Sequence, residues 1–242
     1  MLRGLFLCVL LAASAGYAQH VTVPFVGCPS DGQTGPLNPP HGSSKVVYIK
    51  QEAASHLAWY QAEQGSGVLA PRGWHCFSTY GSNGSSLFVA PQPLTSQTFF
   101  SEHAASFSGP AIQLSEMVGD TSGRFSVALS IARLFPAHRA FAESVRDEHL
   151  GLDTLPTGPS PTDKLRYLSK EAVEFTTPAN HDGEGTHTLL VKSDLPISGV
   201  VMLTGEELSC TTLAVRLPSE LSFLAPVITH QLERDNPPSR ER

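Results

Sequence analysis

The chain has 242 residues, of which 40% are apolar and 16% are charged, and its formal net charge is −6. This apolar content is sufficient for a packed core, so the composition excludes a largely disordered chain. The mild acidity argues against nucleic-acid binding, which usually needs a basic face, and against electrostatic docking on anionic membranes. The length predicts one domain.

The first eighteen residues have the pattern of a secretory signal peptide. Arg3 supplies the positive charge, residues 5–13 form a short apolar run, and Gly16 and Ala18 are the small residues that precede a cleavage site. The apolar run is shorter than the roughly 20 residues that a membrane-spanning helix needs. We therefore predict a signal peptide over residues 1–18, cleavage before Gln19, a periplasmic or secreted protein, and no transmembrane segment after cleavage.

The next segment is rich in glycine, proline and serine, and its hydrophobic periodicity is weak. We predict that residues 19–44 form an irregular arm over the surface. Residues 46–49 are typical of a short strand. Apolar residues then recur at helical spacing before Gly65, which predicts a helix over residues 51–64.

Residues 74–90 carry the clearest local signal. Asn83-Gly84 strongly favours a two-residue hairpin turn, because both positions accept positive φ. A turn at these residues pairs Ser82 with Ser85. Both faces of the two predicted strands are substantially apolar, so we expect the hairpin to be buried on both sides, under a helix on one of them.

The middle of the chain is expected to be mainly helical. After a predicted strand at residues 111–117, residues 124–135 fit both a strand and a helix, and we favour a helix. Pro136 is then the first residue of a second helix that runs to His149. Residues 153–162 contain three prolines and predict a long loop.

The last third of the chain predicts an antiparallel meander and a final helix. The predicted strands are residues 172–176, 186–192, 199–204 and 211–217. The helix follows Ser219, and Pro226 either splits it or marks its start. Residues 235–242 are a charged tail that we expect to be disordered. Together these elements predict a single α+β domain over residues 19–234, with helices packed on an antiparallel sheet.

Cleavage of the signal peptide would leave three cysteines, Cys28, Cys76 and Cys210. An odd number in an oxidising compartment predicts one disulfide and one free thiol. Cys28 lies in the arm, which has little apolar area to hold it in place, and Cys76 lies in an aromatic strand. We predict a Cys28–Cys76 disulfide, with Cys76–Cys210 as the alternative pairing.

The His-rich stretch of residues 180–187 is the best candidate for a metal site. His181 and His187 flank a Gly-rich turn, and Asp182 or Glu184 could supply a third ligand. The spacing matches no standard zinc motif, and turns collect Asn, Asp and Gly for backbone reasons. An ordinary turn is therefore the favoured interpretation, and we predict no metal or other cofactor.

A recognition patch beside the predicted disulfide is a second candidate site. Arg72 is close in sequence to Trp74 and Tyr80, and a cation beside aromatic rings is typical of binding surfaces. The alternative is that Trp74 anchors the arm to the core. The chain has no phosphate-binding loop, dinucleotide fingerprint, zinc-protease helix motif or serine-hydrolase elbow.

Two stretches, VPFVGCPSDGQ at residues 23–33 and LAPRGWHCF at residues 69–77, resemble a family of exported bacterial proteins. The resemblance implies a periplasmic address, and it implies no activity and no site residues. We therefore predict an exported, non-enzymatic protein that binds an envelope protein or a small ligand and no nucleic acid. The alternatives are a metal-assisted hydrolase centred on His181 and His187, and a structural or stress-related accessory protein.

Overall fold

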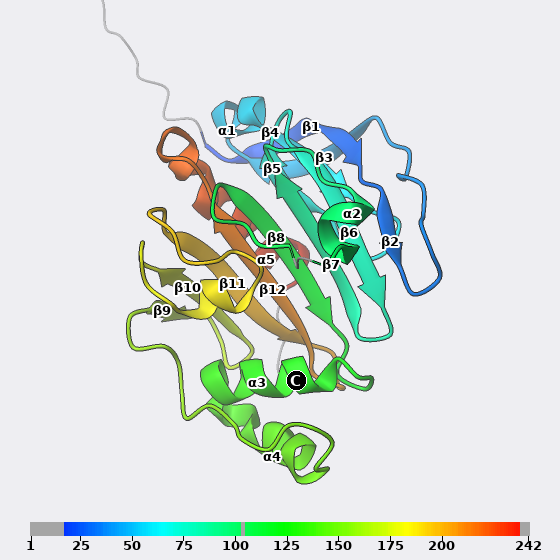
Figure 1. The fold of residues 1–242 in the computed structure, drawn as a ribbon. Helices are drawn as coiled ribbons and strands as arrows, with labels where there is room; N and C mark the ends of the chain where they lie inside the picture. Colours follow the sequence, from blue (N-terminus) through cyan, green and yellow to red (C-terminus); the bar gives the residue numbers. More distant parts are fainter. Residues whose placement is uncertain (1–16, 103–104, 238–242) are drawn as a thin grey trace, which may run out of the picture.

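A computed structural model describes residues 17–102 and 105–237, and within these ranges the fold is α+β with two sheets and five α-helices (Figure 1). The large sheet has eight strands in the order β2-β6-β7-β8-β12-β11-β10-β9, and the small sheet has four in the order β3-β1-β4-β5. Nearly all of the predicted signal peptide, and the end of the predicted tail, lie outside the described residues.

Helices and strands are interspersed along the chain. The strands are β1 (Gln19–Gly27), β2 (Ser30–Gly32), β3 (Ser44–Ile49), β4 (Leu57–Gln61), β5 (Val68–Pro71), β6 (His75–Gly81), β7 (Gly84–Ala90), β8 (Ala111–Met117), β9 (Lys164–Tyr167), β10 (Ala172–Thr177), β11 (Ile197–Thr204) and β12 (Ser209–Arg216). The α-helices are α1 (Gln51–His56), α2 (Ser96–Phe100), α3 (Arg124–Leu134), α4 (Arg139–Asp147) and α5 (Ala225–Asp235). Short 3-10 helices are η1 (Pro136–His138), η2 (Glu184–His187) and η3 (Ser219–Leu224).

The large sheet is the central layer, and different elements cover its two faces. Alternate residues of a strand point to opposite faces, so neighbours on β12 belong to different buried clusters. Leu213 packs in one cluster with the small sheet and with Ile228 of α5, which lies behind the large sheet in Figure 1. Ala214 packs in the other cluster with Ile131 of α3. The sheet is therefore buried on both sides.

The predicted hairpin is confirmed, but its pairing is different. Gly81 pairs with Gly84, rather than Ser82 with Ser85. Each residue's partner moves by two positions from the predicted pairing, which preserves the alternation of faces and leaves both faces buried. Gly84 has a φ of 133°, and a Cβ at this position would overlap the carbonyl group of Glu116 on β8. Glycine therefore permits this close approach.

The first part of the chain is more regular than its composition suggests. Instead of an irregular arm, residues 19–27 form β1, which pairs antiparallel with β3 and parallel with β4. The predicted helix over residues 51–64 ends at His56, because residues 57–61 form β4. Residues 57–60 are all buried. A short, fully buried apolar run does not distinguish a helix from a strand, so periodicity was misleading here.

The later predictions are mostly confirmed. The strand at residues 111–117, the helix α3 and three of the four meander strands are present, and α5 begins with Pro226 in its first turn. The predicted strand at residues 186–192 is wrong, because residues 184–187 form η2. The loop at residues 153–162 contains no helix or strand. The large sheet is antiparallel apart from its β2–β6 pair, which is parallel.

The predicted Cys28–Cys76 disulfide is confirmed, with 5.3 Å between the two Cα atoms. It connects the segment after β1 to β6, and so it links the small sheet to the large one covalently. Cys210 is free and buried, and burial raises the pKa of its thiol to about 11. Among the described residues, no helix has the length and apolar character needed to cross a membrane.

Side chains of α5 occupy the outer edge of β3 at one residue, Tyr48. The amide of Tyr48 donates to Gln231 Oε1 at 3.1 Å, and Arg234 Nη1 donates to the Tyr48 carbonyl at 2.7 Å. The Arg234 guanidinium also lies over the Tyr48 ring, 4.4 Å from its centroid. The final helix therefore holds this edge as well as packing on the large sheet.

Candidate functional site

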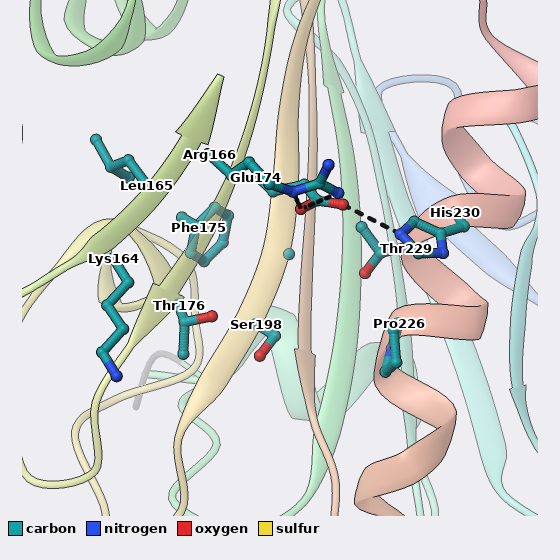
Figure 2. A pocket seen from close by; sticks show the side chains of 11 residues that line it. Lys164, Leu165, Arg166, Glu174, Phe175, Thr176, Ser198, Pro226, Thr229 and His230 are labelled. Carbon is teal, nitrogen blue, oxygen red and sulfur yellow. Dashed lines mark hydrogen bonds and ion pairs between the residues drawn. The ribbon is translucent and has the colours of Figure 1, made fainter. Parts of the chain in front are cut away.

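A cleft of about 390 Å³ lies between helix α5 and the edge of the large sheet formed by β9, β10 and β11 (Figure 2). It is on the same face of the sheet as α5. Polar side chains converge on it from both walls: Lys164, Arg166, Glu174, Thr176 and Ser198 from the strands, and Thr229 and His230 from the helix. The cleft therefore has a charged and hydrogen-bonding lining.

Glu174 of β10 is the centre of the charged groups in the cleft. It pairs in register with Arg166 of β9, whose Nη2 is 2.6 Å from Glu174 Oε2. The other carboxylate oxygen, Oε1, is 3.4 Å from His230 Nε2 on α5 (Figure 2). Glu233, three residues after His230, lies on the same side of the helix, and its carboxyl group is near enough to that of Glu174 to share a proton with it. One strand and one helix thus bring two carboxyl groups and an imidazole together.

The two carboxyl groups have opposite electrostatic surroundings. Burial raises the pKa of Glu233 to about 7, and the hydrogen bond with Glu174 and its negative charge act in the same direction. Burial also raises the pKa of Glu174, but hydrogen bonds from Arg166 and Glu233, with the charges of Arg166 and His230, outweigh burial and lower it overall. Near neutral pH the two carboxyl groups therefore share one proton between their oxygen atoms.

One oxygen of this pair lacks a partner. Glu233 Oε1 is buried, and no N–H or hydroxyl group of the described residues donates a hydrogen bond to it. A buried polar atom without a partner lowers stability, and in a native structure it commonly indicates a bound ion or water. Glu233 is therefore placed to accept a further donor or a cation.

The cluster has the composition of a metal site. In the described part of the chain, Glu174, His230 and Glu233 offer three potential ligand atoms that all lie within 4.8 Å of one another. Two ligands of one zinc ion, each about 2.1 Å from it, are at most about 4.2 Å apart. In tetrahedral coordination the two ligands are about 3.4 Å apart, so atoms separated by the full 4.8 Å would have to approach by about 1.4 Å. One imidazole nitrogen and two carboxylate oxygens suit Zn²⁺ or Mn²⁺, and three protein ligands leave a coordination position open.

The residues of the predicted histidine-rich site are not brought together in this way. His181 is exposed, and its Nδ1 is 2.8 Å from the carbonyl oxygen of Ala179, two residues earlier. Asp182 forms an exposed ion pair with Lys192. Glu184 is buried and pairs with Arg133 of α3. His187 lines a different cavity, on the opposite face of the large sheet. The four residues do not form a three-ligand group of the kind found at Glu174.

The three residues of the predicted recognition patch make internal contacts. Arg72 donates to the carbonyls of Leu57 and Ala54, at 2.8 and 2.7 Å. The side chain of Trp74 is partly buried against the core. The Tyr80 hydroxyl donates to the Gly35 carbonyl at 2.6 Å and lies 2.7 Å from Thr34 Oγ1. These contacts hold neighbouring segments in place, as expected of structural residues.

Two of the three residues of the observed cluster could be placed together from the sequence. His230 and Glu233 are three residues apart on a predicted helix, a spacing that puts both on one face. Glu174 is distant in sequence, and only the packing of α5 on β10 and β11 brings it near. The sequence did not indicate the full cluster, because this contact is long-range.

Comparison with protein-family models, with curated proteins and with solved structures found no match for this chain.

Proposed function

We propose that this chain is an exported, non-enzymatic binding protein that holds a divalent cation such as Zn²⁺ or Mn²⁺ in the cleft between α5 and β9–β11. The observation that carries the proposal is the convergence of Glu174, His230 and Glu233. The disulfide supports export, since such bonds persist mainly in oxidising compartments. The positions of His181 and His187 give no support to a hydrolase centred on them.

Proton exchange explains how the cluster would take up a cation. Metal ligands must be deprotonated, so a cation replaces the proton that Glu174 and Glu233 hold between them. The cation would also give the buried Glu233 Oε1 the partner it lacks. Arg166 opposes binding, because its positive charge already neutralises Glu174. Affinity is therefore a balance between two carboxylates and one fixed cation.

Calorimetric titration of the chelator-treated protein with Zn²⁺ and Mn²⁺ tests the proposal. We expect one site, and a loss of affinity of at least about tenfold, or ~1.4 kcal/mol, in each of E174Q, H230A and E233Q. R166Q should bind more tightly, because it removes a positive charge from beside the site.

Glu171 supplies the matched control. It forms an ion pair with His138 at 3.3 Å, but the two belong to no three-ligand group among the described residues. E171Q should bind like the wild type. Absence of a site in the wild type, or equal losses in E171Q and E174Q, would contradict the proposal.

A further inference from the structure

A second cavity, of about 260 Å³, lies on the opposite face of the large sheet. It is enclosed by α3, the segment of η2 and strands β7, β8 and β12, and it shares no lining residue with the cleft of Glu174. This face otherwise carries an apolar cluster that includes α3 and α4. The cavity is therefore a local interruption of the core.

Polar residues occupy the buried positions that line it. On β8, Gln113 and Ser115 alternate with core residues and are each only 7% exposed. Ser86 of β7 and Ser130 of α3 are each 8% exposed. Burial of a polar group is unfavourable unless it is hydrogen-bonded, and a helix–sheet interface is normally filled with apolar side chains. Four buried polar residues around one cavity thus depart from the pattern expected for packing alone.

Hydrogen bonds fix the floor of the cavity. The hydroxyl oxygens of Ser86 and Ser115 are 2.8 Å apart, and Gln113 Nε2 donates to Ser115 Oγ at 2.8 Å. The amide of Leu189 donates to Gln113 Oε1 at 2.8 Å, which sets the orientation of the side-chain amide. A serine oxygen has two lone pairs, and the glutamine NH₂ has a second proton. The floor therefore presents oriented donors and acceptors with unused capacity.

The charges in the cavity wall cancel one another. Arg133 donates from Nε and Nη2 to the two oxygens of Glu184, at 2.8 and 3.0 Å, and Glu184 is 2% exposed. Partial burial, and then the charge of Arg133, lower the pKa of His187, which favours its neutral form. A charged ligand would find no unpaired opposite charge among the lining residues. The wall therefore favours a neutral ligand.

The cavity opens where His187 and Ser126, both exposed, lie at its rim. At about 30 Å³ for each water of the liquid, its volume corresponds to roughly nine waters. We propose that this cavity binds a neutral polyhydroxylated small molecule, of the monosaccharide or cyclic polyol class. Hydroxyl groups of such a ligand replace several waters at once and match both the donors and the acceptors of the floor.

Saturation-transfer NMR of the mature protein with glucose, mannose and myo-inositol tests the proposal, with glucuronate as the charged counterpart of glucose. We expect saturable binding of at least one neutral probe, and binding of glucuronate at least about tenfold weaker than that of glucose, or ~1.4 kcal/mol. S126W places a large ring at the exposed rim and should abolish the signal. S144W, at an exposed serine of α4, should leave the signal unchanged.

The double variant S86A/S115A tests the floor directly. It removes both members of one hydrogen-bonded pair and leaves only the Gln113 Nε2 amide of the floor without its acceptor, so the variant should remain folded. We expect at least a tenfold loss of sugar affinity, with the Tm measured alongside. E174Q should bind sugar normally, which separates this proposal from the metal proposal. No saturable binding of any neutral probe, a preference for glucuronate, or unchanged binding in S126W would overturn it.

Discussion

Glu233 is the residue whose protonation most directly links the cleft to stability. Its pKa is raised in the folded protein from 4.5 to about 7, so the folded state binds more protons than the unfolded state between these values. The free energy of unfolding should therefore fall as pH rises from about 4.5 to about 7. The lowered pKa of Glu174 acts in the other direction, and only in more acidic solution.

Urea denaturation of the metal-free protein across this range checks the prediction. E233Q, which does not titrate, should lose this part of the pH dependence, and E171Q should retain it. A slope that is the same in the wild type and in E233Q would show that Glu233 titrates normally.

Arg216 is a charged side chain with no exposed surface. Its guanidinium donates to the carbonyls of Phe107, Gly109 and Val191, and so it holds two loops against the end of β12. In R216M these carbonyls lose a charged donor, and we expect the free energy of unfolding to fall by about 2–4 kcal/mol. Arg139 pairs with Glu143 on the surface, so R139M should cost less than about 0.5 kcal/mol in the same urea titration. Similar losses in both variants would contradict this role.

At the scale of the element, local sequence patterns were not sufficient to distinguish a helix from a strand. The helix α3 is present as predicted, although residues 124–135 also fitted the alternation of a strand. The segment of residues 57–61 had helical spacing, but it lies buried between β1 and β5 as a strand. Local patterns cannot report such tertiary burial. For the same reason the sequence did not indicate that Glu174 lies beside His230 and Glu233 of α5.

A substitution at Gly84, the first residue of β7, tests how strongly the backbone after the β6–β7 turn requires glycine. In G84A the alanine must adopt a φ of 133°, and its Cβ must displace the Glu116 carbonyl of the neighbouring strand. We expect a loss of about 1–3 kcal/mol, measured by thermal and urea denaturation. Gly158 has no positive φ and no atom within 4 Å of an added Cβ, so G158A should have little effect. Equal stability of the two variants would contradict the argument.

At the scale of the whole molecule, the disulfide adds a covalent connection between the two sheets, which short backbone segments after β1 and β5 also join. Cys28 and Cys76 are 48 residues apart, and closing a loop of this length restricts the unfolded chain. Replacing both with alanine, or adding reductant to the wild type, should lower the free energy of unfolding by about 2–4 kcal/mol. Reductant should have no further effect on C28A/C76A. An unchanged denaturation midpoint in reduced wild type would refute the prediction.

The predicted architecture and the observed one agree at this scale, because composition and cysteine spacing constrain the whole chain more than its parts. An α+β fold with one disulfide was predicted, and the structure has both. The two cavities could not be predicted. Each is formed by segments that are far apart in sequence, such as Gln113 beside Glu184, and their approach depends on how the helices pack on the two faces of the sheet.

The contact of α5 with the edge of β3 has a consequence for how molecules of this protein behave beside one another. An unpaired strand edge offers free amide and carbonyl groups on which a second chain can add, and repeated addition leads to fibrils. Gln231 and Arg234 occupy these groups at Tyr48. We therefore expect a chain shortened before Gln231 to leave the Tyr48 amide and carbonyl free for backbone pairing with a second chain.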